Sequence, residues 1–131
     1  MDESIGTGRI LIDTSILINY YREKNIEKTM FYQLTSVYDF SISIITEFEF
    51  LVGFNDEKLD FAKEIIKEMQ IFNINKDISE IARRLYIKLK KINKMIPFTD
   101  LFIAATAVYH QLPLATLNKK HFENIEEIIL I

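Results

Sequence analysis

Four side chains that carry oxygen ligands lie at the expected boundaries between strands and helices: Asp13, Glu49, Asp100 and Asn118. Asp13 directly follows a short apolar run that is typical of a buried strand, and Asn118 follows the strand expected over 114–116. Glu49 lies one helical turn after a run rich in β-branched residues, and Asp100 opens an Ala-rich helix. Because parallel α/β sheets bind ligands at the carboxyl ends of their strands, we expect these four side chains at one edge of a sheet.

This set of ligands predicts a site for a hard divalent cation. Three carboxylates and one carboxamide offer only oxygen, which Mg²⁺ and Mn²⁺ prefer. Carboxylates placed a few ångströms apart raise one another's pKa, and a cation removes that cost. A bound cation can also polarise a phosphoryl oxygen and activate water. We therefore expect Mg²⁺ or Mn²⁺, as one or two ions.

Each of these residues also has a purely structural interpretation, which stays open when it is taken singly. Asp13 is a good N-cap for the helix that follows it. Thr46 and Glu49 have the spacing of a capping box. Asp100 suits the positive end of a helix dipole, and Asn118 is a common turn residue. The shared edge of the sheet is what favours a binding site.

The elements that position these residues alternate along the chain. The predicted strands cover residues 9–13, 40–45, 71–74, 114–116 and 127–131. The predicted helices cover residues 14–24, 26–37, 46–54, 57–69, 77–92 and 99–111. Alternation of this kind implies right-handed crossovers and a three-layer α/β/α fold with a mainly parallel central sheet.

The composition is that of a globular protein, with 49% hydrophobic and 27% charged residues. A length of 131 residues predicts a single domain over 1–131, with 1–8 as a flexible N-terminus. The absence of cysteine excludes disulfides, zinc–thiolate sites and thiol chemistry. Without an apolar leader or a membrane span, we expect a cytoplasmic protein. A net charge of −3 predicts that any contact with nucleic acid is local or made through a cation.

Four motifs occur in order along nearly the whole chain. They are Ile10–Ile18 (ILIDTSILI), Ser43–Gly53 (SIITEFEFLVG), Asp100–Ala107 (DLFIAATA) and Leu114–Phe122 (LATLNKKHF). Together they resemble the PIN-domain family and, within it, the VapC toxins. The third motif, close to the family's D-x-x-I-A-A-x-A, is the most specific.

The resemblance implies a metal-dependent ribonuclease, usually dimeric and held inactive by a small antitoxin protein. By motif position, the catalytic and metal-binding acids of the family fall on Asp13, Glu49 and Asp100. Glu47 is the other candidate for the second acidic position. Glu49 is favoured because its spacing to Gly53 matches the family's T-x-x-E-L-x-x-G motif. The expected reaction is in-line hydrolysis of an RNA phosphodiester by water activated at the ion.

The chain departs from the family pattern at Asn118, where many members have Asp, and at His121, where a further Asp is frequent. Both departures lower the negative charge of the site and put a tightly held second metal ion in doubt. Asn118 is still expected among the metal ligands. Ser15 is expected to support Asp13, and Thr116 to contact a substrate phosphate or water at the ion.

Two histidines are candidate general bases. His110 lies late in a predicted helix, where a positive charge is favourable, so it is interpreted as structural. His121 is interpreted as a surface or turn residue with a small chance of touching RNA.

Two further patches suggest partners. The basic side chains of the helix over 77–92 and its end are Arg83, Arg84, Lys88, Lys90, Lys91 and Lys94. A solvated helix face is the commoner explanation, and an RNA-backbone track through Arg83, Arg84, Lys88 and Lys91 is the alternative.

Four phenylalanines lie close together in the sequence, at positions 48, 50, 54 and 61. Most are expected in the core. A strip left over around Phe50 and Phe54 would suit a groove for an antitoxin helix.

Three other functions are compatible with a small α/β protein that carries acidic residues. A haloacid-dehalogenase-type phosphatase needs a second Asp at the position that Ser15 occupies, so it is excluded. A response-regulator receiver domain would leave Asp100 without a role. A non-catalytic PIN-like module that binds RNA or protein stays open, because Asn118 replaces an Asp of the family.

Overall fold

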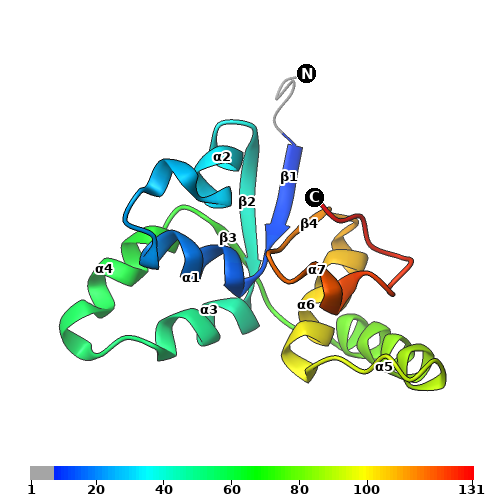
Figure 1. Cartoon of the computed structure of the whole chain (residues 1–131). Coiled ribbons are helices and arrows are strands. Elements are labelled where there is room, and N and C mark those ends of the chain that lie inside the picture. Colours follow the sequence, from blue (N-terminus) through cyan, green and yellow to red (C-terminus); the bar gives the residue numbers. More distant parts are fainter. Residues whose placement is uncertain (1–7) are drawn as a thin grey trace.

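The computed structural model describes residues 8–131, whose centre is a four-stranded parallel sheet (Figure 1). The strand order is β3-β2-β1-β4, and every strand pairing is parallel. The strands are β1 (Gly8–Ile12), β2 (Tyr38–Ser43), β3 (Gln70–Phe72) and β4 (Leu114–Ala115). Gly8, expected in the flexible N-terminus, thus begins β1, while residues 1–7 of that expectation lie outside the described residues.

Helices cover both faces of the sheet, which confirms the predicted three-layer α/β/α fold (Figure 1). The helices are α1 (Thr14–Arg22), α2 (Met30–Thr35), α3 (Ile44–Val52), α4 (Asp56–Ile66), α5 (Lys76–Lys91), α6 (Phe98–His110) and α7 (Lys119–Phe122), with a 3-10 turn η1 (Ile26–Lys28). Helices α1 to α4 lie on one face, and α5 to α7 lie on the other. No helix among residues 8–131 is long and apolar enough to cross a lipid bilayer.

Strand β1 shows why both faces are covered. Ile10 and Ile12 are fully buried in the core beneath α1, α3 and α4, whereas Leu11 is fully buried in the core beneath α5 and α6. Successive side chains of a strand point to opposite faces, so an uninterrupted apolar run needs a core on each side. The end of β1 is therefore enclosed on both faces at the point where Asp13 follows it.

The chain departs from the sequence-based elements at several boundaries. Residues 44 and 45 belong to α3 and not to β2, because the side chain of Ser43 caps the helix by accepting from the amide of Ile45 at 3.0 Å. The helix expected over 26–37 is divided, because extended Thr29 ends η1 and caps α2.

The strand expected over 127–131 is wrong. Residues 119–122 form α7, turns follow, and only Leu130 makes a bridge to Leu114 of β4. Because the chain after α7 returns to the sheet only at its last residues, a single bridge takes the place of a strand.

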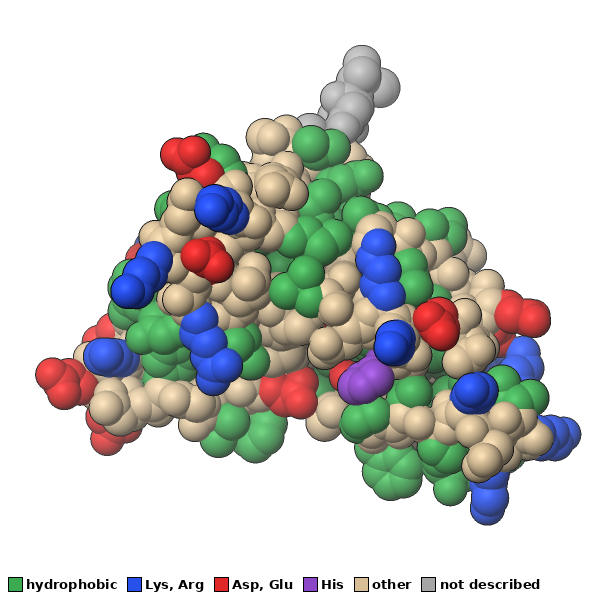
Figure 2. Space-filling view, in the orientation of Figure 1, with side chains coloured by type: hydrophobic (Ala, Val, Ile, Leu, Met, Phe, Trp, Pro, Cys, Tyr) green, Lys and Arg blue, Asp and Glu red, His purple; other side chains and the backbone are tan. Residues whose placement is uncertain are grey.

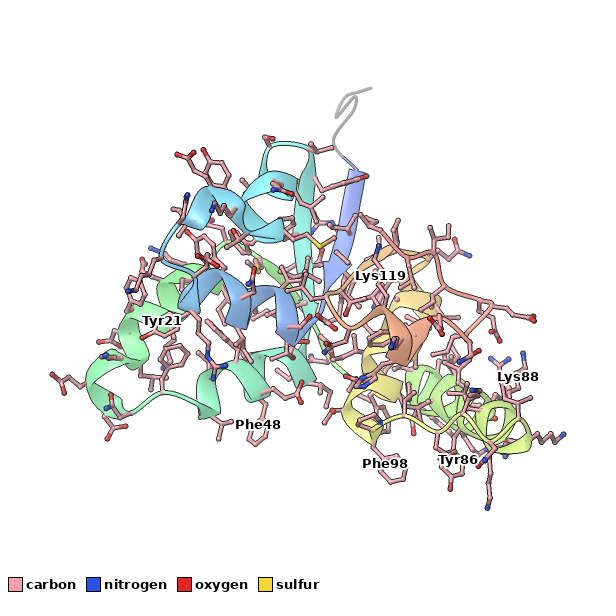
Figure 3. All side chains as sticks on the ribbon, in the orientation of Figure 1. Tyr21, Phe48, Tyr86, Lys88, Phe98 and Lys119 are labelled. Carbon is pink, nitrogen blue, oxygen red and sulfur yellow. The ribbon has the colours of Figure 1, made fainter. Side chains whose placement is uncertain are left out.

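The apolar strip lies elsewhere than expected. Phe50 is buried, with 2% of its surface exposed, and its ring packs against that of Phe54. Phe48 and Val52, one turn apart on α3, are each 66% exposed. Figure 3 shows Phe48 pointing away from the molecule. We call Phe48 and Val52 the α3 strip; Phe61 on α4 is separately exposed.

Candidate functional site

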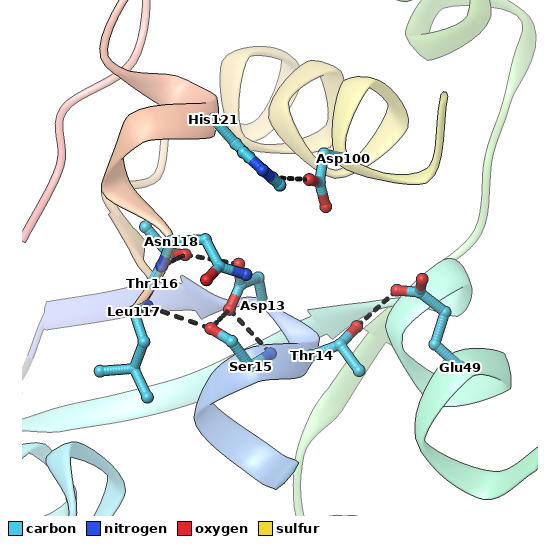
Figure 4. Close-up of polar contacts among 9 residues, drawn as sticks. All are labelled: Asp13, Thr14, Ser15, Glu49, Asp100, Thr116, Leu117, Asn118 and His121. Atoms are coloured by element: carbon cyan, nitrogen blue, oxygen red, sulfur yellow. Dashed lines mark hydrogen bonds and ion pairs between the residues drawn. The ribbon is translucent and has the colours of Figure 1, made fainter. Parts of the chain in front are cut away.

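Asp13 is the most constrained side chain at the carboxyl edge of the sheet (Figure 4). It is 2% exposed and caps α1 by accepting from the amide of Ser15. The Ser15 hydroxyl donates to Oδ1 at 2.5 Å, and the Thr116 hydroxyl donates to Oδ2 at 2.6 Å. Asp13 therefore has the predicted capping role and is also held in one orientation by two hydroxyls, one from the first turn of α1 and one from the segment after β4.

The surroundings of Asp13 raise its pKa above the ordinary value of 3.8. Burial is the main cause, and the nearby charge of Asp100 adds to it. Hydrogen bonds from Ser15 and Thr116 act in the opposite direction without cancelling the effect. A positive charge in front of Asp13 would therefore stabilise its ionised form.

Glu49 enters the site from α3. The hydroxyl of Thr14 donates to its Oε1 at 2.6 Å, so the first residue of α1 orients a carboxylate of another helix. This bond could not be predicted from the sequence, because Thr14 matched only a helix-start pattern. Glu49 lines the cavity described below and Glu47 does not, which favours Glu49 over its rival.

Asp100 is paired with His121. Nδ1 of His121 lies 2.5 Å from Oδ2 of Asp100, which joins the start of α6 to α7 (Figure 4). His121 is therefore not simply a surface or turn residue, as its position in the sequence had indicated. The expectation missed this contact because α7, which carries His121, was not predicted.

The carboxylates share one cavity of about 470 Å³. Asp13, Glu49, Asp100 and Asn118 all line it, together with Ser15 and Arg22. Arg22 is a positively charged wall residue that sequence reasoning missed, since it lies at the polar end of α1 and matches no motif. All four predicted metal ligands thus border the same space.

The arrangement fits a divalent cation in its chemistry. Asp13 and Asp100 interact electrostatically across the cavity, and carboxylate oxygens are preferred ligands of Mg²⁺ and Mn²⁺. Within residues 8–131, no three Asp, Glu or His side chains are close enough together to hold one ion. Ligation of a single ion by all three carboxylates therefore stays a prediction. Asp13 and Asp100 are the two carboxylates whose interaction supports it.

Two other predicted residues have different surroundings from those expected. Thr116 is buried, and its hydroxyl donates to Asp13. The same hydroxyl accepts from the backbone amide of Asn118 at 2.9 Å. His110 is stacked on Phe72 with ring centroids 3.8 Å apart, and burial lowers its pKa. His110 thus has the structural role that was expected. Its neutral form is favoured, however, whereas the sequence had indicated a favourable positive charge at this end of the helix.

The basic side chains of α5 do not line the cavity. Arg83 pairs with Glu80 at 3.1 Å, and Lys88 pairs with Glu127 at 2.6 Å. Arg84 and Lys91 are exposed on the same helix. The contact of these four residues with RNA stays a prediction, and two of them already have acidic partners.

Comparison with known families and proteins agrees with this geometry. The family model described as PIN domain matches residues 10–128. The chain is 38% identical to Ribonuclease VapC1 from Methanocaldococcus jannaschii over 121 residues, which covers 92% of this chain and 83% of the relative.

Solved structures show the same fold. A toxin–antitoxin complex from Klebsiella pneumoniae contains a chain with 29% identity and a TM-score of 0.75, covering 92% of this chain and 95% of that one. VapBC2 from Rickettsia felis, solved bound to a DNA fragment from its promoter, gives a TM-score of 0.80 at 21% identity. That match covers 94% of this chain and 97% of the other.

Proposed function

This chain belongs to the PIN-domain family, and we propose that it is a VapC-type ribonuclease that hydrolyses RNA phosphodiesters with Mg²⁺ or Mn²⁺. The observation that carries the proposal is the single cavity lined by Asp13, Glu49 and Asp100 at the carboxyl edge of the sheet. The name of its relative Ribonuclease VapC1 supports RNA as the substrate.

Asp13 and Asp100 would hold the cation, with Glu49 and Asn118 on the wall of the same cavity. When bound, Mg²⁺ or Mn²⁺ supplies Lewis acidity at the scissile phosphate and offsets the charge of the carboxylates. One ion is the minimum, and Asn118 lowers the negative charge available for a second.

The chain's own residues keep the carboxylates ready for this role. Ser15 and Thr116 hold one oxygen each of Asp13, and Thr14 holds one oxygen of Glu49. His121 fixes one oxygen of Asp100. Partners of this kind orient ligands before the cation and the substrate arrive, so less reorganisation is needed.

The physiological role that we propose is the toxin of a toxin–antitoxin pair that acts on cytoplasmic RNA. Support comes from the similar chain in the Klebsiella pneumoniae toxin–antitoxin complex. The antitoxin would cover the α3 strip, Phe48 and Val52, which is exposed on the same helix that carries Glu49. A homodimer is also proposed, from the family resemblance alone.

A second candidate function is a non-catalytic PIN-like module that binds RNA or protein. It is favoured by Asn118, which stands where many family members have Asp. It is also favoured by the absence of a cluster of three ligating side chains within residues 8–131.

Cleavage by the purified protein without any antitoxin separates the two functions. Structured and single-stranded RNA would be incubated with Mg²⁺, with Mn²⁺ or with EDTA. We expect cleavage with either metal ion and none in EDTA, and we expect Asp100→Asn to remove it. Binding without cleavage under all metal conditions would establish the non-catalytic module instead.

A further inference from the structure

Three cavities adjoin one another across the carboxyl edge of the sheet. The central one is the acidic cavity already described. A cavity of about 310 Å³ shares Ile18, Arg22 and Glu49 with it on the side of α3 and α4. Another of about 590 Å³ shares Leu117 and Asn118 with it on the side of α7. Because they share wall residues, the three cavities lie side by side, and we call them together the trough.

The two flanks of this trough are basic, whereas its centre is acidic. Arg22 and Lys58 line the flank toward α4, and Lys119 and Lys120 line the flank at α7. All four are exposed, and none of them forms an ion pair with another described residue. Figure 2 shows Lys and Arg side chains on both sides of the acidic and histidine side chains at the centre of this face.

This charge pattern suits a polyanion that crosses the acidic centre. The chain carries a net charge of −3, so the molecule as a whole does not attract phosphate. The acidic centre repels phosphate unless a cation is bound there. Cations that form no ion pair within residues 8–131 flank the centre on both sides, and they can hold the phosphates on either side of it without neutralising the carboxylates.

We propose that single-stranded RNA lies along this trough, with its backbone held by Arg22 and Lys58 on one side and by Lys119 and Lys120 on the other. The inference rests on the proposed ribonuclease function and names the strand path for it. In this proposal the trough, and not the basic face of α5, is the main RNA contact. Arg83 and Lys88 of that face are already paired with Glu80 and Glu127, and none of its basic residues lines the trough.

Three double variants that each remove two positive charges test the path. They are Arg22→Gln/Lys58→Gln, Lys119→Gln/Lys120→Gln and, as the matched control on α5, Arg84→Gln/Lys91→Gln. Each would be made in an Asp100→Asn background, so that the RNA stays intact. Binding of a fluorescein-labelled oligouridylate of about twelve nucleotides would be followed by anisotropy over a range of salt concentrations. Circular dichroism checks the fold of each variant.

Both trough variants are expected to bind roughly tenfold more weakly than the parent. Their salt dependence should be flatter by about 1.4 in log–log slope, the value for two lost phosphate contacts to a single strand. The α5 control should change neither quantity. A loss confined to one flank, or an equal or larger loss in the α5 control, would overturn the proposed path.

Failure of the path and failure of the function are distinguishable. If the Asp100→Asn parent does not bind the RNA although the wild-type protein cleaves RNA, only the path is overturned. If the wild-type protein does not cleave RNA with any metal ion, the ribonuclease proposal fails and the path fails with it.

Discussion

The hydroxyl of Thr116 donates a 2.6 Å hydrogen bond to Oδ2 of Asp13, and so joins two loops that are 103 positions apart in sequence. The same hydroxyl accepts a hydrogen bond from the backbone amide of Asn118. One small side chain therefore ties the first acidic residue of the site to the residue that follows β4. Its removal should disturb both stability and the ionisation of Asp13.

Thr116→Val is expected to destabilise the protein by about 1–3 kcal/mol, because a buried carboxylate oxygen and an amide lose a partner. It should also raise the pKa of Asp13 further, since this bond lowers it. The acid limb of the pH–rate profile would then move to higher pH. Urea unfolding and the pH profile measure the two effects. Thr116→Ser keeps the hydroxyl and should restore both, so an unmoved profile in Thr116→Val would contradict this role.

Asp13→Asn is expected to abolish RNA cleavage while stabilising the fold at neutral pH. Burial raises the pKa of Asp13 above 3.8, so the native state keeps this proton over a range in which the unfolded chain has lost it. The contribution of Asp13 to stability is therefore fully present at low pH and is lost as pH rises through the folded pKa. Asn carries no charge and avoids that loss.

Urea unfolding from acidic to neutral pH measures this effect. The advantage of Asp13→Asn over the wild type should grow as the pH rises. Asp39→Asn, at an exposed position of β2, is the matched control and should show no such trend. A variant that loses stability relative to the wild type as pH rises would refute the assigned cause of the shift.

Thr14→Val tests the hydrogen bond that orients Glu49. Loss of a side chain that orients a metal ligand typically costs 10–100-fold in metal affinity or activity. We expect the Mg²⁺ concentration at half-maximal cleavage to increase within about that range, and Thr14→Ser to return it to the wild-type value. Unchanged Mg²⁺ dependence in Thr14→Val would mean that Glu49 acts independently of this bond.

Phe48→Ser tests the α3 strip as the antitoxin surface. Because Phe48 is 66% exposed, its replacement should change the free energy of unfolding by no more than about 0.5 kcal/mol. Binding of the proposed antitoxin should weaken by about tenfold or more, measured by calorimetry. Phe61→Ser is the control, because Phe61 is 61% exposed but lies on α4, outside the strip. Equal binding by Phe48→Ser and the wild type would place the antitoxin elsewhere.

The sequence predicted most of the elements and the edge of the sheet at which the acidic residues lie. Apolar runs mark strands that are buried on two faces, and amphipathic segments mark the helices that cover them. The position of Asp13 at the end of β1 could therefore be predicted from the apolar run that precedes it. The α3 helix was also anticipated, and Glu49 lies on it as expected.

Side-chain contacts between elements that are distant in the sequence could not be predicted from local patterns. The His121–Asp100 pair depends on α7, a single turn of helix with no periodic apolar pattern to reveal it. The place of Arg22 on the cavity wall depends on how α1 is oriented above the sheet, which the sequence of α1 does not determine. Local sequence predicts which residues follow a strand, but packing decides which side chains meet.

Anomalous diffraction from a crystal soaked in Mn²⁺ would locate the ion on which the proposed reaction depends. We expect a peak in the central cavity, with carboxylate oxygens of Asp13 and Asp100 at coordination distance and Glu49 facing the same ion. The peak should be absent from a matched Asp13→Asn crystal. A wild-type crystal without any peak in this cavity, or with manganese bound only elsewhere, would show that these carboxylates do not form a metal site.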